Sequence, residues 1–518
     1  MEPTILSIDC GTQSLRTHIF DLSGNLLATK KIEYEPYFSL NPGWAEQDAN
    51  IFWASTIKGI KELKKNYPDL TDLIAGIGVT TQRDTMICCD KNGEALRPAI
   101  TWLDQRKATP VFQPNFIVKS GAKALGMLET IYKIQAEGKC NWIMQNEKKI
   151  WDKTYKYLQV SGFLNHKLTS VFKDSKASQI GHIPFNYKKM QWASKYEIQS
   201  FLFPVEKSKL PEVIEPGQTI GHLSQKASDE TGLKKGIPVI ACGSDKGCET
   251  IGNGVYSNET ASLSFGTTAT VQTTSEKYFE PIKFMPPYPA PYPRHYNPEV
   301  EIFRGYWMIT WYKNEFAHPE IKEAQKTGVQ PEILLDRLLD QTPPGAMGLV
   351  LQPFWSPGLN HHNAKGAIIG FGDVHTRAHV YRAVIEGLSY ALFDGLLKIE
   401  KKSKTKVKKL AVSGGASQSD NICQISADIF NRPILRGKTC ETSGLGAAII
   451  TAYGLGFYKD IKDAGTHMIN YQKEFIPNES SSILYKKIYE NVYSKMYKAL
   501  EPVYKEIRQI TGYPEIYR

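Results

Sequence analysis

The sequence has few cysteines and no long hydrophobic run. Its eight cysteines among 518 residues are too sparse for a disulfide framework, and the neighbouring pairs Cys88/Cys89 and Cys242/Cys248 lack the paired C-x2-C spacing of a zinc site. No window approaches the roughly 18 consecutive apolar residues of a membrane-spanning helix, and the N-terminus, MEPTILSIDC, lacks the basic start of a signal peptide. These absences predict a protein of the reducing cytoplasm with no membrane partner.

Two common nucleotide-binding signatures are also missing. Gly437-Lys438-Thr439 resembles the end of a phosphate-binding P-loop, but Arg432 stands where that motif requires a glycine. No G-x-G-x-x-G follows a predicted strand, so a Rossmann dinucleotide site has no support. A nucleotide, if one binds, must be held by another kind of turn.

The positive charge is not concentrated. The formal net charge is +10, but the excess lies in many short lysine pairs, and the densest run, Lys401–Lys409, precedes an apolar strand-like segment and is expected to be a solvated helix end. This distribution predicts no nucleic-acid partner. A nucleic-acid-binding protein remains an alternative, which would show strongly salt-dependent binding.

The chain carries a weak internal repeat. Its composition, 41% hydrophobic and 22% charged, suits two ordinary domains. Residues 4–29 predict a strand, a glycine turn and further strands, and residues 260–274 repeat the pattern, with IDCGTQS (8–14) matching LSFGTTA (263–269). We therefore expect two related α/β domains, residues 1–256 and 257–518, the second ending in an amphipathic helical extension.

Three glycine turns follow apolar strand-like runs, at Gly11-Thr12, Gly266-Thr267 and Gly414-Gly415. Without a Cβ in the way, such turns allow several backbone N–H groups to approach one anion. Each turn alone is better explained as an ordinary strand connection. Together, with hydroxyl groups beside the first two, the three turns make a phosphate-binding site as plausible as ordinary connections.

Two aspartates stand beside these turns. Asp9 closes the first predicted strand, and Asp245 follows the apolar strand PVIACGS. A carboxylate next to a phosphate can hold Mg²⁺ or take a proton from an attacking hydroxyl group. For Asp245 the alternative is a helix N-cap.

Eight segments in the chain resemble, in order, the motifs of the FGGY carbohydrate kinases. They are IDCGTQSLR (8–16), NPGWAEQDANIFW (41–53), GVTTQRDTM (78–86), ITWLDQR (100–106), GSDKGCETIG (243–252), LSFGTTA (263–269), AVSGGASQSDNICQISADIFNRP (411–433) and ETSGLGAA (441–448). The resemblance implies an α/β fold of two actin/hexokinase-like (ribonuclease H-like) domains with a nucleotide cleft between them. It also implies an enzyme that uses ATP and Mg²⁺ to phosphorylate a hydroxyl group of a small sugar or polyol.

The same resemblance implies roles for single residues. Asp245 is the expected general base, and Asp9 and Asp245 the expected Mg²⁺ ligands. The expected ATP-binding residues are Thr12, Gln13, Ser14, Gly266, Thr267, Thr268, Gly414, Gly415 and Asn421, and the expected acceptor-binding residues are Arg83, Asp84, Trp102, Asp104 and Lys246.

The chain departs from the family pattern in three places. The acceptor motif reads Gln82-Arg83-Asp84, closer to the Gln-Arg-Glu of glycerol kinases than to the Gln-Met-His-Gly of xylulokinases, and Lys246 stands where relatives usually carry Gln or Asn. Such a cation would lower the pKa of Asp245 or contact an anionic substrate group. Residues 278–315, with seven prolines between Pro281 and Pro298, predict an insertion packed on the second domain, with a substrate lid or a dimer contact as alternatives.

Several choices stay open. The acceptor can be a ketopentose such as xylulose, a polyol such as glycerol, or an aldonate, and a homodimer is possible. The rival function is a catalytically weak sugar- or nucleotide-binding regulatory protein on the same fold, motivated by Lys246 and by the aromatic segment.

Overall fold

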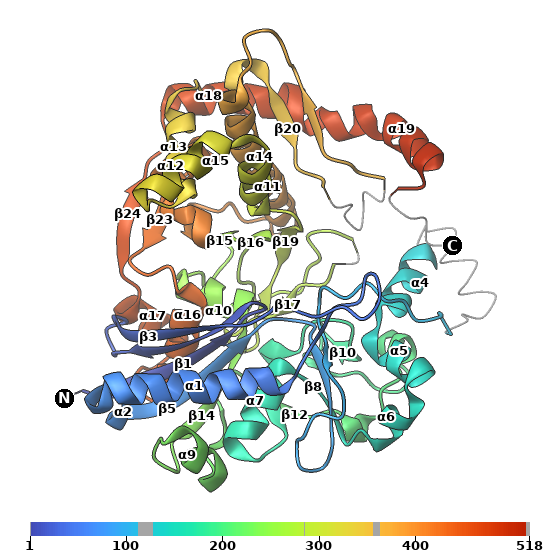
Figure 1. Ribbon diagram of the computed structural model, residues 1–518, viewed down its shortest axis with the longest axis vertical. Coiled ribbons are helices and arrows are strands. Elements are labelled where there is room, and N and C mark those ends of the chain that lie inside the picture. Colours follow the sequence, from blue (N-terminus) through green and yellow to red (C-terminus); the bar gives the residue numbers. More distant parts are fainter. Residues whose placement is uncertain (1, 112–127, 284, 356–362, 514–518) are drawn as a thin grey trace.

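The computed structural model describes residues 2–111, 128–283, 285–355 and 363–513. Two six-stranded sheets organise the chain, one in each half of the sequence, and the two halves lie one above the other in Figure 1. This arrangement confirms the expected two-domain α/β fold. In the described ranges no helix has the length and apolarity needed to cross a membrane.

The first sheet has the strand order β13-β14-β5-β1-β2-β3. Its strands are β1 (Thr4–Cys10), β2 (Ser14–Phe20), β3 (Leu26–Glu33), β5 (Ile74–Thr81), β13 (Thr219–His222) and β14 (Pro238–Ser244). Strands β14, β5 and β1 are neighbours and parallel. Every residue of β1 is buried, as expected of a central strand covered on both faces. The strands expected between residues 4 and 29 are confirmed.

Helices α1 (Asn50–Asn66), α7 (Val160–Thr169) and α9 (Gln225–Thr231) pack together beside this sheet. A smaller sheet, in the order β4-β7-β6-β8, extends the same half. Its strands are β4 (Glu46–Gln47), β6 (Met86–Cys89), β7 (Ala99–Ile100) and β8 (Lys156–Gln159). Helices α4 (Leu128–Glu137) and α5 (Lys139–Asn146) stand beside it.

The second sheet has the strand order β19-β16-β15-β22-β23-β24. Its strands are β15 (Thr260–Phe265), β16 (Ala269–Gln272), β19 (Glu299–Ile302), β22 (Lys409–Ser413), β23 (Ile434–Gly437) and β24 (Tyr471–Phe475). Strands β15, β22 and β23 are parallel. Helices α11 (Trp307–Phe316), α12 (His318–Thr327), α13 (Pro331–Asp340), α14 (Arg377–Ser403) and α15 (Asp420–Phe430) belong to this half.

Two helices cross where the halves meet, α10 (Asp245–Gly252) and α16 (Thr442–Gly454). A Cβ atom on Gly446 would lie 1.8 Å from the carbonyl oxygen of Cys248, and one on Gly252 would lie 2.1 Å from that of Thr442. Only glycine permits this close crossing. The crossing fixes Asp245, the first residue of α10, against the second half of the chain.

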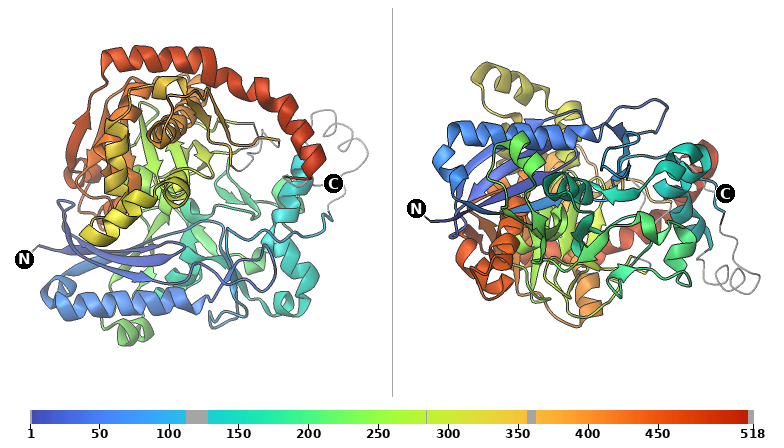
Figure 2. Two further views of the ribbon diagram at one scale, coloured as in Figure 1. Left: turned by 45° about the horizontal axis from the view of Figure 1, so that its top comes forward. Right: turned by 90° about the horizontal axis from the view of Figure 1, so that it is seen from below.

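The end of the chain is helical, as predicted. Helix α18 (Glu479–Ile488), a π-helical turn (Tyr489–Tyr493) and α19 (Ser494–Thr511) run in succession over the second half (Figure 2, left). The buried face carries Tyr485, Tyr493, Met496 and Tyr504. A single amphipathic helix was expected, whereas the π-helical turn divides it into two segments.

The proline-rich segment packs on both halves of the molecule. It forms β17 (Tyr288–Pro289), β18 (Tyr296–Asn297) and the edge strand β19 before it enters α11. The Tyr288 ring lies 5.2 Å from the Arg83 guanidinium carbon, and the Tyr296 hydroxyl donates to the carbonyl oxygen of Lys188 at 2.7 Å. The expectation of an insertion packed on the second domain alone is therefore incomplete, because the segment also reaches the acceptor motif.

Candidate active site

The candidate site lies at the carboxyl ends of parallel strands. In the first sheet β1, β5 and β14 are parallel, so the Gly11 turn, Arg83 and Asp245, which follow these strands, lie at one edge. In the second sheet β15 and β22 are parallel and lead into the turns at Gly266 and Gly414. Open α/β sheets bind ligands at such edges.

The two edges touch. A Cβ on Gly266 would lie 3.9 Å from Lys246 Nζ, and a Cβ on Gly414 would lie 3.0 Å from the backbone nitrogen of Gly266. The structure thus brings the second and third glycine turns together beside the helix that begins at Asp245.

Asp245 is the first residue of α10 but does not cap it. The cap is Ser244, whose hydroxyl receives the backbone N–H of Gly247 at 3.3 Å, so the alternative interpretation of Asp245 as an N-cap is wrong. Burial raises the pKa of the Asp245 carboxyl, although Arg83 and Lys246 act to lower it. A carboxylate with a raised pKa is a stronger proton acceptor, which suits a general base.

Lys246 points toward the second half of the chain. Its ammonium group donates to Glu249 Oε2 at 2.9 Å and to the Ser264 hydroxyl. Glu249 is buried and also receives the hydroxyl of Ser413. The positive charge of Lys246 is therefore paired, and it does not reverse the effect of burial on the pKa of Asp245.

Asp9 has neighbours that suit a divalent cation. Burial raises its pKa to about 7 against the opposing effect of Arg16, and the carboxylates of Asp245, Glu441 and Glu249 raise it further. A divalent cation relieves such repulsion, and Mg²⁺ prefers carboxylate oxygens. Asp9 and Asp245 therefore each offer the kind of oxygen atom that Mg²⁺ prefers, and their role as its ligands stays a prediction.

His18 and Glu441 are also near Asp9, and one potential ligand atom from each of the three lies within 4.8 Å of the others. Burial, with Arg16, lowers the pKa of His18 to about 3, so this imidazole is neutral. Arg16 Nε lies 3.5 Å from Glu441 Oε1. This ion pair gives Glu441 a structural partner.

The first glycine turn joins the acceptor side through Thr12. The Trp102 indole N–H donates to the Thr12 hydroxyl at 2.9 Å, and this hydroxyl donates to Gln82 Oε1 at 3.0 Å. Gln13 is exposed, whereas Ser14 is buried at the start of β2. Thr12 and Trp102, predicted to bind different substrates, are in direct contact.

The second and third turns present backbone rather than charged side chains. Gly414 has φ +88° and lies against the end of β15, where a Cβ would approach the Phe265 carbonyl carbon to 2.7 Å. Thr267 and Gly415 are exposed, and the Thr268 hydroxyl donates to the Phe303 carbonyl oxygen at 3.3 Å. The structure thus places the two turns next to each other, and their role in binding phosphate stays a prediction.

On the acceptor side, Arg83 and Asp84 each have partners from a distant part of the chain. Arg83 forms two 2.9 Å hydrogen bonds with the carboxylate of Glu299, and its Nε lies 3.8 Å from Asp245 Oδ1. Asp84 Oδ2 receives Lys139 Nζ at 2.6 Å and lies 2.8 Å from His182 Nδ1. Burial would raise the pKa of Asp84, but Lys139 and His182 hold it well below its usual range.

Backbone geometry fixes Asp84 in this position. Its φ is +51°, an uncommon value for a residue other than glycine. Gly181, with φ +135°, passes so close that a Cβ there would lie 2.3 Å from Asp84 Oδ1. The loop before His182 therefore requires glycine at residue 181.

Among the residues that the structure describes, no contact brings Asp104 or Asn421 into this group. Asp104 is buried and forms a two-pronged ion pair with Arg106, with both N–O distances 2.8 Å. The Asn421 amide donates to Asp340 Oδ1 at 3.0 Å, so it faces α13. Their predicted roles in binding acceptor and ATP stay predictions.

Four residues of the site escaped the sequence analysis: Lys139, His182, Glu249 and Glu299. Glu249 lies within the motif GSDKGCETIG, three residues after Lys246, and this helical spacing was a usable signal. The other three lie outside all the motifs, and only the fold brings them to Arg83 and Asp84.

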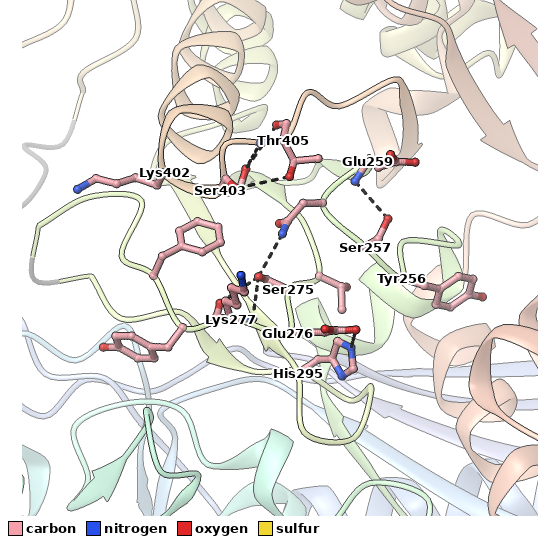
Figure 3. A pocket seen from close by; sticks show the side chains of 14 residues that line it. Tyr256, Ser257, Glu259, Ser275, Glu276, Lys277, His295, Lys402, Ser403 and Thr405 are labelled. Carbon is pink, nitrogen blue, oxygen red and sulfur yellow. Dashed lines mark hydrogen bonds and ion pairs between the residues drawn. The ribbon is translucent and has the colours of Figure 1, made fainter.

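One sizeable pocket, of about 490 Å³, lies elsewhere (Figure 3). Its lining includes Tyr256–Glu259 and Ser403, which precede β15 and β22, so it lies at the opposite ends of these strands from the glycine turns. No residue predicted for the active site lines it. The pocket is therefore separate from the site assembled above.

Comparison with known proteins identifies the class. Residues 4–252 match the N-terminal domain of the FGGY family of carbohydrate kinases, and residues 261–455 match the C-terminal domain. The chain belongs to this family. It is therefore an ATP-using carbohydrate kinase, a phosphotransferase with an alcohol group as acceptor.

Individual relatives cover nearly the whole chain. The uncharacterized sugar kinase YgcE of Escherichia coli is 27% identical over 98% of this chain and 96% of its own length. A xylulose kinase of Staphylococcus epidermidis is 29% identical over 99% of this chain and 98% of its own. The crystal structure of a gluconate kinase from Lactobacillus acidophilus superposes with a TM-score of 0.82 at 22% identity, covering 98% of this chain and 100% of that one.

Proposed function

We propose that this kinase transfers the γ-phosphoryl group of ATP to a hydroxyl group of a small sugar or polyol, with Asp245 as the general base. The observation that carries the proposal is the position of Asp245. Its carboxylate lies 3.8 Å from Arg83 on the acceptor side, and the next residue, Lys246, lies beside the Gly266 turn. Asp245 thus stands where an acceptor and a triphosphate would meet.

The three glycine turns would hold the nucleotide, with Thr12, Gln13, Ser14, Gly266, Thr267, Thr268, Gly414, Gly415 and Asn421 as its contacts. Asp9 and Asp245 would hold Mg²⁺, which neutralises phosphate charge when it is bound. Phosphoryl transfer depends on positioning and electrostatic stabilisation more than on covalent catalysis. Backbone turns and a few charged side chains are therefore sufficient for this reaction.

The proton passes directly from the acceptor to Asp245. The acceptor hydroxyl gives its proton to a carboxylate oxygen of Asp245 as the hydroxyl oxygen forms its bond to the γ-phosphorus, and the bond to ADP breaks. Burial keeps the pKa of Asp245 above its ordinary value, which favours this transfer. Arg83, Asp84 and Trp102 would orient the acceptor, with Lys139 and His182 holding Asp84.

Because some relatives are named as xylulose kinases, a ketopentose is one candidate acceptor. The Gln-Arg-Asp motif makes a polyol such as glycerol a second candidate. A cytoplasmic location, a homodimer and the domain boundary at residues 256/257 are further predictions. The rival function, a regulatory protein with weak catalysis, would use the same site without turnover.

A coupled ADP-release assay tests the proposal. ATP–Mg²⁺ would be combined with pentuloses, hexuloses, polyols and aldonates, with Asp245→Ala as the control. One strong acceptor, lost in the variant, supports the proposal. No acceptor above background, with ATP still raising the Tm of the protein, supports the regulatory role.

A further inference from the structure

One buried histidine beside Asp9 has a ring nitrogen without a partner. The His18 side chain, on β2, is fully buried. Its Nδ1 lies 2.9 Å from the Thr29 hydroxyl oxygen, whereas its Nε2 has no hydrogen-bond partner in the described parts of the chain. Leaving a buried polar atom without a partner costs free energy. We therefore expect Nε2 to have a partner that the chain itself does not supply.

Two carboxylates lie beside this imidazole. Its Nε2 is 3.9 Å from Glu441 Oε2, and one potential ligand atom from each of Asp9, His18 and Glu441 lies within 4.8 Å of the others. Ligand atoms that share one metal ion are about 3–4 Å apart, because the bonds to the metal are about 2.0–2.2 Å long. The three side chains therefore need only a small contraction to hold one ion.

The register of β1 and β2 brings two of these side chains to the same face of the sheet. Asp9 is directly opposite Arg16, and Ser7 is directly opposite His18. Opposite residues of an antiparallel pair share a face, as do residues two apart on one strand. The Asp9 carboxylate and the His18 imidazole are therefore held by the central strands of the first sheet.

Helix α16 supplies the third side chain. Glu441 immediately precedes this helix, and α16 packs on the imidazole so closely that a Cβ on Gly444 would lie 2.6 Å from His18 Cδ2. Arg16 Nε lies 3.5 Å from Glu441 Oε1, which leaves Oε2 as the oxygen beside His18. The Glu441 side chain is 26% exposed, so an ion can reach the group from solvent.

One imidazole and two carboxylates form a donor set that suits a transition metal. Mg²⁺ prefers oxygen ligands, whereas imidazole nitrogen suits Zn²⁺ and its neighbours in the first transition row. Burial, with Arg16, lowers the pKa of His18 to about 3, so the ring is in the neutral form that binds metals. When Nδ1–H donates to the Thr29 hydroxyl, Nε2 carries the lone pair, and such a second bond is typical of metal-bound histidines.

We propose that Asp9, His18 and Glu441 form a site for a divalent transition-metal ion such as Zn²⁺, with a ligand set different from the Asp9 and Asp245 pair expected to hold Mg²⁺. Thr29 is a positioning residue, since it acts through His18. Both ligand sets use Asp9, so an ion bound here should compete with Mg²⁺ and inhibit the kinase. This inhibition rests on the proposed function, whereas the binding of the ion does not.

Calorimetric titration of the full chain with Zn²⁺, after removal of metals with a chelator and without nucleotide, tests the binding. We expect one Zn²⁺ per chain, and a Kd for Mg²⁺ at least about 100-fold higher, because Mg²⁺ gains little from a nitrogen ligand. Co²⁺ should give a visible absorption band that Zn²⁺ removes. If Zn²⁺ does not bind stoichiometrically, the inference is wrong and the proposed function is unaffected.

Three variants test the ligands. His18→Gln removes the nitrogen donor and should weaken Zn²⁺ binding at least about 100-fold, because loss of an outer partner alone weakens metal binding by about 10–100-fold. Thr29→Val removes that outer partner from the exposed side of β3 and should weaken binding about tenfold. Glu441→Gln should weaken it at least as much. Unchanged Zn²⁺ affinity in Thr29→Val and Glu441→Gln would contradict the site, even if His18→Gln does not fold.

The chain offers two matched controls. His166 is also buried and stacks on Phe172 with ring centroids 3.9 Å apart, but in the described ranges it belongs to no group of three potential ligands. Cys440 is an exposed free thiol next to Glu441. His166→Gln and Cys440→Ser should both keep the wild-type Zn²⁺ affinity. Binding that is lost in Cys440→Ser but kept in His18→Gln would assign the ion to the thiol and overturn the inference.

Inhibition has a separate readout. In the ADP-release assay, Zn²⁺ should raise the apparent KM for Mg²⁺, and the concentration of Zn²⁺ that halves the activity should be at least about tenfold higher in His18→Gln than in wild type, as expected from the loss of a ligand. Equal inhibition of both proteins would contradict the competition. Absence of phosphoryl transfer to every acceptor would overturn the proposed function without changing the binding result.

Discussion

The acceptor side and the nucleotide side of the site are built differently. On the acceptor side, buried side-chain pairs such as Arg83–Glu299 and Lys139–Asp84 join residues far apart in the sequence. On the nucleotide side, glycine turns at the ends of adjacent strands present backbone atoms, and Gly414 sits directly against Phe265. We expect the first arrangement to select its substrate by fixed charge and the second by backbone shape.

This difference determines how each side responds to substitution. A buried pair that loses one partner leaves an uncompensated charge, whereas a glycine turn fails when a Cβ closes the space that it needs. Asp245 lies between the two and depends on both. Substitutions on either side should therefore separate binding of the acceptor from binding of ATP.

The largest effect is expected at the junction. Asp245→Asn removes the proton acceptor and should lower kcat by about 1,000-fold, within the range typical of general bases. The Tm should stay near the wild-type value, because the substitution also removes a buried carboxylate. Steady-state kinetics with a saturating acceptor measures the loss, and a kcat within tenfold of wild type would exclude Asp245 as the base.

The acceptor side should be sensitive to loss of one ion-pair partner. Lys139→Met leaves the Asp84 carboxylate, which is 15% exposed, with less compensation and should reduce the free energy of unfolding by about 3 kcal/mol. Urea denaturation measures this value. The control is Lys148→Met, which breaks an exposed pair with Asp152 and should leave stability unchanged. Equal losses of stability in both variants would contradict the expected difference between a buried and an exposed ion pair.

The nucleotide side should be sensitive to one methyl group. Gly414→Ala places a Cβ against Phe265 at a positive φ and should raise KM for ATP about tenfold, since a strained turn no longer presents its amides. A Cβ on Gly236, which also has φ +88°, meets no atom within 4 Å, and Gly236 lies before β14, away from the site, so Gly236→Ala serves as the matched control. ATP titrations of the two variants should differ, and equal affinities would refute the role of backbone shape.

The smallest expected effect is a pH-dependent gain in stability. The pKa of Asp9 is raised to about 7 from an ordinary value of 3.8. The protonated carboxyl therefore contributes fully to the free energy of unfolding below pH 3.8, and this contribution is lost as the pH rises through about 7. Asp9→Asn should therefore be about 1–2 kcal/mol more stable than wild type at pH 8 without Mg²⁺ or ATP. The gain should vanish near pH 4, and the exposed-site variant Asp152→Asn should show none.

The sequence predicted the nucleotide side better than the acceptor side. The turns at Gly11, Gly266 and Gly414 were visible because each follows an apolar run, and the structure places them at the expected strand ends. The strand pattern of both halves was visible for the same reason. Local sequence specifies such turns through glycine and β-branched residues.

The acceptor side could be predicted only in part. Arg83 and Asp84 lie in a motif, but Glu299 is more than 200 positions from Arg83 in the sequence, and its role depends on how β19 joins the second sheet. Lys246 is paired with Glu249, a partner that the motif alone did not reveal. Motifs show which charged residues are present, whereas only the fold shows which of them are already neutralised.

The most direct test of this account is the KM for each substrate in two variants, Arg83→Met and Gly414→Ala. We expect Arg83→Met to raise the acceptor KM at least about tenfold with little change for ATP, and Gly414→Ala to do the reverse, because each interaction contributes to one substrate only. Variants that raise both KM values together, or that exchange their effects, would contradict the assignment of the two sides.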